Sequence, residues 1–334
     1  MNDFGKYNYV ISFGFGKVYE TAFAQIGEID NAAFFNFEDD RSKLQNLLYH
    51  LAFTPKLNRK FQGLFTKIVF YNEKNHFKRL LDKMTNNNNC VILAAASYRP
   101  WEKRGFFVYL KKKIPNLKIV YYCTDIIKSS PLLKEIGNGN SADLTVTYDF
   151  GDSNKYSFEY YPVPFSDLPG KYVNSDCKFD ICFIGAKKQR LEAIYEAYDY
   201  FSTMGLICAF YVIGCEDSEK REGINYPNYM SYQDYLYIEA QSNCILEIMQ
   251  DNECYGNTFR VPEAIFMNKK LISNNLSLID KKYFYPDKMK VYKNVTEIDK
   301  EFIINRSSGD YPNSIKVMFR PSGFLEFLEV KLSE

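Results

Sequence analysis

The residues with the clearest chemical potential lie in one stretch, 243–275 (NCILEIMQDNECYGNTFRVPEAIFMNKKLISNN). A buried apolar strand, a polar loop with one glycine, a helix start and a second short strand follow one another here. Asn257 or Thr258 can cap the helix, and Pro262 falls in its first turn, where a missing N–H costs little. A strand–loop–helix unit of this kind directs backbone N–H groups toward the strand's carboxyl end, which predicts an anion site.

The same residues also fit a plain structural unit without a ligand. In that interpretation Arg260 and Glu263 form an i,i+3 pair on an exposed helix face.

A second candidate for anion binding is the turn at 185–190. An apolar strand at 179–184 precedes Gly185, Lys187 and Arg190, and the pattern LEAIYEAYDYF after them predicts a helix. Backbone N–H groups, the helix dipole and the Arg190 guanidinium together could hold a diphosphate. The turn is not a P-loop, because the Gly-Lys-Ser/Thr ending is absent.

Two features of the N-terminal half lie at predicted strand ends. Gly14, Phe15 and Gly16 follow the strand at 7–13, but Tyr19 stands where a dinucleotide-binding turn needs a third glycine or alanine. A ligand-facing loop and an empty tight turn fit these residues equally.

Asp125 follows the strand at 117–123, at the carboxyl ends of the strands, where open α/β sheets bind ligands, so it is a candidate base or acceptor contact. A helix cap would look the same.

Other chemistries find little support. Glu38-Asp39-Asp40 suits a helix N-terminus better than a metal site. His50 and His76, the two histidines, fall in helical patterns away from any nucleophile motif. Asp149-Phe150-Gly151 spells a kinase motif without its companion motifs. We therefore expect neither a metal nor another cofactor.

The segment 99–113 (RPWEKRGFFVYLKKK) mixes cations with aromatic residues. Such a mixture suits peripheral contact with an anionic membrane. The competing interpretation is a helix that packs its aromatic side chains on the sheet and exposes its lysines. The packing interpretation is slightly favoured over membrane contact.

Length and composition limit the class of protein. A chain of 334 residues suits two α/β domains, and 46% hydrophobic with 25% charged residues is typical of globular proteins. A net charge of +1 gives no electrostatic reason to expect nucleic acid as a partner. The eight cysteines form no CxxC pair, which favours reduced cysteines in a cytoplasmic protein. No signal peptide or membrane-spanning run is recognisable.

The pattern of strands and glycine turns predicts an α/β fold with two Rossmann-like domains facing a cleft. The Pro- and Gly-rich stretch at 160–170 is the best domain boundary. We expect an N-terminal acceptor domain over 1–166, a C-terminal donor domain over 167–312, and a last helix over 313–334 that packs back on the N-terminal domain.

Three pieces of the sequence, over about the last two-thirds of the chain, resemble a known group of enzymes. They are 148–161 (YDFGDSNKYSFEYY), 183–190 (FIGAKKQR) and 245–275. They are similar to bacterial glycosyltransferases with the GT-B fold that build capsular polysaccharide, exopolysaccharide and lipopolysaccharide. The resemblance implies a nucleotide-sugar donor bound by the C-terminal domain and a glycan or lipid-linked acceptor bound by the N-terminal domain.

The resemblance also implies roles for particular residues. Glu263 would contact the donor's ribose, and Tyr229 and Met230 would lie near its base. The groups expected around the diphosphate and sugar are Gly185, Lys187, Arg190, Gln250, Gly256, Asn257, Thr258 and Arg260. The turn of Gly14, Phe15 and Gly16 would lie on the acceptor side, with Asp125 as the catalytic carboxylate.

One departure from the family pattern leaves the stereochemistry open. Tyr255 stands eight positions before Glu263, where retaining enzymes carry a glutamate. Inversion and retention are therefore both compatible with the sequence. The alternatives to a transferase are a sugar-nucleotide epimerase on the same fold and a catalytically inactive nucleotide-sugar-binding or scaffold protein.

Overall fold

The computed structural model describes residues 5–13, 16–36, 42–61, 63–173, 175–249, 255–305 and 309–334. The chain divides into two compact units. The N-terminal unit comprises Met1–Pro162 and Pro321–Glu334, and the C-terminal unit comprises Val163–Arg320. These divisions fall at 162/163 and 320/321, whereas the sequence-based boundaries fall at 166/167 and 312/313.

The N-terminal unit is built on a parallel six-stranded sheet with the order β2-β1-β3-β4-β5-β6. Its strands are β1 (Tyr7–Phe13), β2 (Ala32–Asn36), β3 (Asn88–Ala94), β4 (Leu117–Cys123), β5 (Leu144–Thr147) and β6 (Glu159–Tyr160). The inner strands β1, β3 and β4 are almost continuously apolar because helices cover both faces of the sheet.

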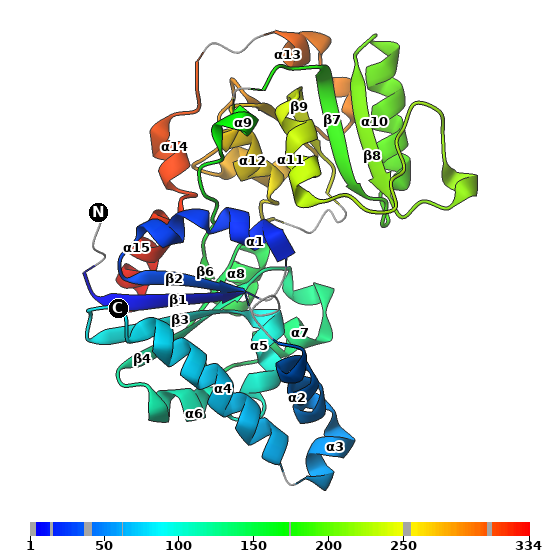
Figure 1. Ribbon diagram of the computed structural model, residues 1–334. Helices are drawn as coiled ribbons and strands as arrows, with labels where there is room; N and C mark the ends of the chain where they lie inside the picture. The colour runs from blue at the N-terminus through cyan, green and yellow to red at the C-terminus, as the bar shows by residue number, and fades with distance from the viewer. Residues whose placement is uncertain are drawn as a thin grey trace. The chain divides into compact units, whose positions relative to one another are not determined.

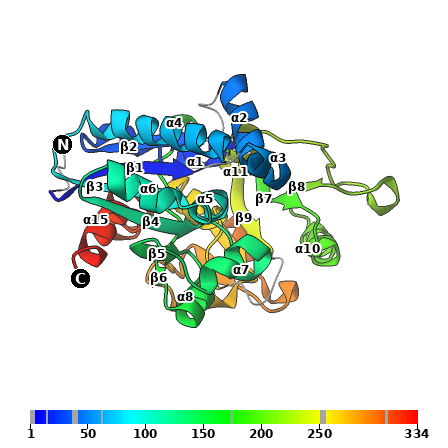
Figure 2. The same ribbon diagram turned by 90° about the horizontal axis from the view of Figure 1, so that it is seen from below.

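Helices connect these strands and form the outer layers of the N-terminal unit (Figure 1). They are α1 (Gly16–Ala22), η1 (Ala24–Glu28), α2 (Lys43–Phe53), α3 (Pro55–Lys60), α4 (Leu64–Leu81), α5 (Ala95–Glu102), α6 (Phe106–Lys113), η2 (Ile127–Ser129), α7 (Pro131–Gly137), α8 (Phe150–Tyr156) and α15 (Pro321–Lys331). Figure 2 views the unit from the side on which α4 and α6 cover the sheet. On the opposite face, α15 packs its Phe324 ring 5.5 Å from Tyr122 and 5.0 Å from Tyr161.

The basic and aromatic segment 99–113 forms the end of α5 and all of α6. Its Trp101, Phe106 and Phe107 side chains are buried in the main core of the unit. Several of its cations have acidic partners, such as Lys111 with Asp143 at 2.8 Å. The packing interpretation therefore explains these aromatic residues, and membrane contact through the segment stays a prediction that would rest on the lysines alone.

The C-terminal unit contains a second parallel sheet, with the order β11-β10-β9-β7-β8. Its strands are β7 (Phe179–Ala186), β8 (Cys208–Ile213), β9 (Ser242–Glu247), β10 (Lys270–Ser273) and β11 (Met289–Val291). The connecting helices are α9 (Gly170–Val173), α10 (Leu191–Thr203), η3 (Asp217–Glu219), α11 (Tyr232–Ala240), α12 (Arg260–Phe266), η4 (Leu276–Asp280), η5 (Val295–Glu297), α13 (Lys300–Ile304) and α14 (Asn313–Val317).

Both sheets share one topology. In each, the first strand lies between the second and the third, so the direction of winding reverses beside it. Open α/β sheets bind ligands in the crevice at the carboxyl ends of the strands at this switch point. The topology therefore points to the ends of β1 and β3 in the N-terminal unit and of β7 and β9 in the C-terminal unit.

Two further observations concern the described residues as a whole. Within the described ranges, no helix has both the length and the apolar character needed to cross a bilayer. The seven cysteines that the structure describes are all free, and Cys177 is the exposed one.

Candidate functional site

Arg190 spans the switch point of the C-terminal unit. Its Nε and Nη2 donate to the carbonyl of Ala186 at the end of β7, both at 3.2 Å. Its Nη1 donates to the carbonyl of Ile248, the residue that follows β9. The guanidinium is thus fixed across the two strand ends, where the topology predicts a ligand.

Arg260, the first residue of α12, brings a second guanidinium to the same place. Its Nη2 donates to the carbonyl of Ile184, and the group lies 5.7 Å from the centre of the Phe183 ring. The Arg190 guanidinium lies 5.3 Å from that ring centre. Both guanidiniums therefore lie against the same aromatic ring, that of Phe183 on β7, at distances suited to cation–π interactions.

Gly185 has no side chain and so leaves room for both guanidiniums. A Cβ at this position would lie 2.8 Å from Nη2 of Arg190 and 3.1 Å from Nη2 of Arg260. Any side chain here would push the guanidiniums apart. The glycine after the apolar strand, visible in the sequence, is thus required by the close approach of two arginines and not by backbone conformation.

We predict that Gly185→Ala weakens donor binding at least tenfold and changes the free energy of unfolding by less than about 1 kcal/mol. The flexible guanidiniums can move away from the new methyl group, at the expense of the geometry that an anion needs. Titration calorimetry with a nucleoside diphosphate and urea unfolding measure the two quantities. Gly27→Ala is the matched control, because nothing lies within 4 Å of a Cβ at Gly27. Equal affinities for wild type and Gly185→Ala would contradict the prediction.

The electrostatics of the two arginines differ. Burial, and then repulsion from Arg260, lowers the pKa of Arg190 to about 10. Burial alone would also lower the pKa of Arg260, but Tyr235 and the buried carboxylates around it hold that pKa above its ordinary value. The buried Nε of Arg260 has no hydrogen-bond partner among the described residues. Two like charges and an unpaired donor at one point are suited to an anionic ligand.

Glu247, the last residue of β9, is the counter-charge behind the arginines. It is fully buried, and its two oxygens accept hydrogen bonds from Thr258 and, at 2.5 Å, from Ser273. The Thr258 hydroxyl also accepts from the backbone N–H of Arg260 at 3.2 Å. Glu247 therefore fixes the start of α12 and, through it, the position of Arg260.

Glu263 lies on the same helix but faces the interior. Its carboxylate is fully buried and accepts from the Tyr232 hydroxyl at 2.5 Å and the Tyr235 hydroxyl at 3.0 Å. The interpretation of Arg260 and Glu263 as an exposed surface pair is wrong, because the glutamate is inside the unit. The predicted contact with a ribose would require one of these tyrosine hydroxyls to move aside.

A second buried carboxyl, Glu239 on α11, adjoins Glu263. Burial raises the pKa of Glu239 well above its ordinary value, and the negative charge of Glu263 raises it further. Burial also raises the pKa of Glu263, opposed by the hydrogen bond from Tyr232 and the charge of Arg260. The two carboxyl groups therefore titrate as a coupled pair, in which the pKa of Glu239 is raised well above its ordinary value.

The raised pKa of Glu239 predicts a pH effect on stability. The stabilising contribution of protonated Glu239 is complete below the unfolded pKa and is lost as the pH rises through the elevated folded pKa. Glu239→Gln cannot ionise at this position, so its stability should fall less than that of wild type as the pH rises above the unfolded pKa of about 4.3. Urea unfolding at several pH values checks this. Parallel curves for the two proteins would contradict a raised pKa of Glu239.

The loop before α12 is described from Tyr255 onward, and predicted donor residue Gln250 lies outside the described residues. The Gly256 carbonyl accepts from Asn275 at 2.7 Å. Asn257 is fully buried, and its side-chain oxygen accepts from the N–H of Val163 at 3.3 Å. Asn257 therefore holds the loop. The prediction that Asn257 or Thr258 caps the helix is wrong, because the N-cap residue of α12 is Phe259 and no side chain caps it.

The remaining donor-side residues lie nearer the surface. Lys187 pairs with Glu219 at 2.6 Å, and this hydrogen bond raises the pKa of the lysine. Tyr229, in the loop before α11, exposes 80% of its surface, and the adjacent Met230 is half-buried. Such an exposed ring is available for stacking on a flat ligand.

In the N-terminal unit, the described residues among those predicted from the sequence, Gly16 and Asp125, follow the carboxyl ends of β1 and β4. Asp125 is exposed two residues after β4, and one of its oxygens accepts from the N–H of Ile126 at 3.1 Å. It does not cap η2, whose N-cap residue is Ile126. Gly16 begins α1, whereas Gly14 and Phe15 lie outside the described residues.

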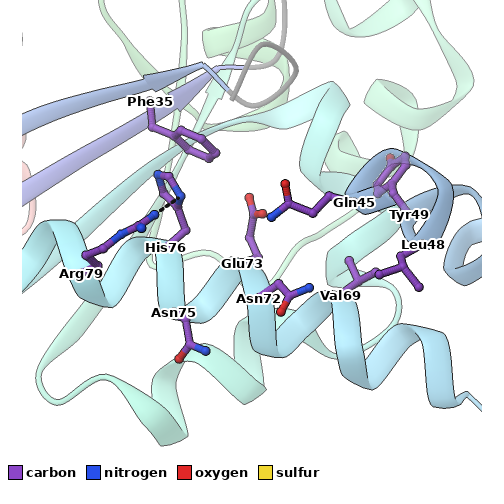
Figure 3. Close-up of a pocket in the computed structure, with 10 residues that line it drawn as sticks. All are labelled: Phe35, Gln45, Leu48, Tyr49, Val69, Asn72, Glu73, Asn75, His76 and Arg79. Carbon is purple, nitrogen blue, oxygen red and sulfur yellow. Dashed lines mark hydrogen bonds between the residues drawn. The ribbon is translucent and has the colours of Figure 1, made fainter. Parts of the chain in front are cut away.

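A cavity of about 300 Å³ lies between α2, α4 and the end of β2 in the N-terminal unit (Figure 3). Its lining combines amides, charged groups and rings: Phe35, Gln45, Leu48, Tyr49, Val69, Asn72, Glu73, Asn75, His76 and Arg79. Figure 3 shows Gln45 and Glu73 pointing toward each other across it. Glu73 accepts from the Tyr98 hydroxyl at 2.8 Å, which is 2.7 Å from that of Ser12 on β1.

His76 is part of this lining, although the sequence pattern indicated only a helical residue. Its ring stacks on Phe35 with the centroids 3.9 Å apart, and its Nδ1 lies 3.0 Å from Arg79. Among the residues that the structure describes, no three His, Cys, Asp or Glu side chains are grouped as metal ligands.

Comparisons with known proteins agree with this architecture. The sequence matches no protein-family model and no curated protein. Solved structures match over nearly the whole chain. One is a trehalose-6-phosphate synthase studied for glycosyl transfer with retention, with 10% identity, a TM-score of 0.53 and coverage of 98% of this chain and 99% of that one. Another is a UDP-forming α,α-trehalose-phosphate synthase from Burkholderia xenovorans, with 9% identity, a TM-score of 0.52 and coverage of 99% of both chains.

A third similar structure is an α-glucosyltransferase in complex with UDP and DNA. Its identity is 10%, its TM-score 0.54, and the match covers 98% of this chain and 99% of that chain. At such identities the likeness defines the fold. The chain therefore has the two-sheet α/β architecture of the GT-B glycosyltransferases.

Proposed function

We propose that this chain is a glycosyltransferase that moves a sugar from a nucleoside diphosphate sugar to a glycan or lipid-linked acceptor in bacterial surface polysaccharide synthesis. The observation that carries the proposal is the pair of guanidiniums, Arg190 and Arg260, at the switch point of the C-terminal unit. A departing nucleoside diphosphate gains negative charge in the transition state. Fixed cations in a partly buried site stabilise that charge without reorganising during the reaction.

Stabilising the leaving group requires no metal ion at this site. Because the two guanidiniums supply the charge that a divalent ion would otherwise provide, we expect turnover to persist in the presence of a metal chelator. Tyr229 offers an exposed ring on which the donor's base can stack. Two of the similar structures are a UDP-forming synthase and a transferase in complex with UDP, so UDP-sugars are the first donors to test.

The N-terminal unit would receive the acceptor. The cavity beside α4 combines a carboxylate, amides, a histidine and aromatic rings, which together suit a hydroxyl-rich ligand such as a sugar. Asp125, exposed at a strand end, is the carboxylate assigned to orient or deprotonate the acceptor hydroxyl.

The test is turnover. Purified protein is incubated with a panel of nucleotide sugars, with and without glycan and lipid-linked acceptors, and release of nucleotide is followed. A transferase releases nucleotide faster when a suitable acceptor is present. An epimerase would convert the donor without any acceptor, and an inactive binding protein would bind a donor without releasing nucleotide. Either of these outcomes would overturn the proposal.

A further inference from the structure

A second cavity, of about 430 Å³, lies in the C-terminal unit away from the arginines. Among its lining residues, Asn243 is the second residue of β9, Lys270 is the first of β10, and Lys288 directly precedes β11. The cavity therefore lies at the amino ends of these parallel strands, whereas Arg190 and Arg260 lie at the carboxyl ends of β7 and β9. A six-residue strand such as β9 separates the two ends by about 17 Å, so the cavity is a separate site.

Three lysines give this cavity its character. Lys269 and Lys270 each expose 7% of their surface, and Lys288 exposes 1%. Over the described part of the chain, no carboxylate lies within 4.0 Å of any of the three ammonium groups. Asp176 lines the cavity but is exposed, and Asp310 acts on Lys288 from a greater distance. Three buried cations without paired anions are costly unless a ligand supplies negative charge.

The contacts that the three lysines make use only some of the hydrogen-bond donors of their ammonium groups. Lys270 donates to the carbonyls of Phe302 and Asn305 at the end of α13, which is a structural role. Lys269 donates to the Cys177 sulfur at 3.2 Å. Lys288 donates to the Asn268 carbonyl at a long 3.4 Å, and its ammonium lies 5.4 Å from the centre of the Tyr311 ring. Each ammonium has three N–H donors. Most of the donors of Lys269 and Lys288 are thus available to a ligand.

Burial also acts on these groups electrostatically. It lowers the pKa of Lys270 and of Lys288, and for Lys288 the nearby lysines add to the effect while Asp310 opposes it. A bound anion would stabilise the charged form of these lysines and so raise their pKa again. The amides of Asn243, Asn268 and Asn305 complete a polar lining.

We propose that this lysine cavity binds a phosphate group, either as free phosphate or as a small phosphomonoester, through Lys269 and Lys288. Lys269 and Lys288 directly precede β10 and β11 and line the same cavity. A phosphate dianion offers several acceptor oxygens to their ammonium groups, and lysine binds phosphate as a point charge. The cavity is larger than one phosphate, so a small organic group fits beside it. Its volume of about 430 Å³ is too small for a polymer.

The test is calorimetric titration of inorganic phosphate and of glycerol 2-phosphate into the full chain at constant ionic strength and pH 7. We expect saturable binding of at least one probe to wild type, and at least tenfold weaker binding to Lys269→Gln and Lys288→Gln. Lys290→Gln is the matched control, because Lys290 lies on β11, pairs with Asp299 at 2.7 Å and does not line the cavity. It should bind like wild type.

Two results would overturn the proposal. One is the absence of saturable binding of both probes, and the other is a loss in Lys290→Gln equal to the losses in the cavity variants. Phosphate could also occupy the arginine site, so Arg190→Gln/Arg260→Gln is titrated as well, and abolition of binding there likewise contradicts the proposal. Urea unfolding verifies that each variant is folded. Should Lys288→Gln fail to fold, Lys269→Gln decides, since its described side-chain contact is a single thiol.

Discussion

Replacing Arg260 by glutamine is expected to lower kcat/KM for the nucleotide-sugar donor by about 100- to 1000-fold, the usual consequence of removing a fixed donor that stabilises developing negative charge. The side chain has the unpaired Nε and lies against the Phe183 ring at the end of β7. Glutamine removes the charge and the planar fork of donors at once. Steady-state kinetics of nucleotide release measure the effect.

A matched variant separates this local effect from a general loss of positive charge. Arg221→Gln removes an exposed arginine of the same unit, which pairs with Asp199 at 3.2 Å. It should leave kcat/KM within about twofold of wild type, since exposed pairs contribute little. Arg190→Lys, which keeps the charge but loses the fork, should fall between the two. If Arg260→Gln and Arg221→Gln have the same kinetics, the arginine site is not the donor site.

Replacing Glu263 by alanine is expected to lower the free energy of unfolding by about 3–5 kcal/mol. The change leaves the Tyr232 and Tyr235 hydroxyls without their acceptor and removes a negative charge that raises the pKa of Arg260. It also leaves a cavity in a fully buried position. Urea unfolding, with the slope compared between proteins, gives the stability change.

This experiment also decides what Glu263 does. Tyr232→Phe and Tyr235→Phe remove one hydrogen bond each while keeping the carboxylate. Each should cost only about 1 kcal/mol. If Glu263 binds the ribose, freeing one of its oxygens should preserve or improve donor affinity. A stability loss below about 1 kcal/mol for Glu263→Ala would show that the buried network does not depend on it.

The elements with strong patterns are predicted well by the sequence. The strands at 7–13 and 117–123 have the predicted bounds, and the helix predicted at 191–201 is observed as Leu191–Thr203. Continuous apolar runs and glycine turns carry enough signal to define two parallel sheets. The short edge strands β6 and β11 have no such pattern, because two or three residues are too few for a period to show.

The candidate site is harder to predict because it depends on burial and on pairs distant in sequence. Arg190 and Arg260 could be nominated from their neighbours, but their convergence on Gly185 joins residues some 70 positions apart. Glu239 sits in an ordinary helical pattern, and only the packing of α11 against α12 reveals it as the partner of Glu263. Lysines are usually exposed, yet the structure buries Lys269, Lys270 and Lys288.

The most direct test of the central claim measures thermal and urea stability with nucleosides, nucleoside monophosphates and nucleoside diphosphates. The account predicts that at least one nucleoside diphosphate stabilises wild type, by about 2.7 kcal/mol at a hundred times its Kd. The matching nucleoside should have no effect, and Arg190→Gln/Arg260→Gln should abolish the stabilisation. Absence of stabilisation by every nucleoside diphosphate at millimolar concentration, or unchanged stabilisation in the double variant, would contradict the account.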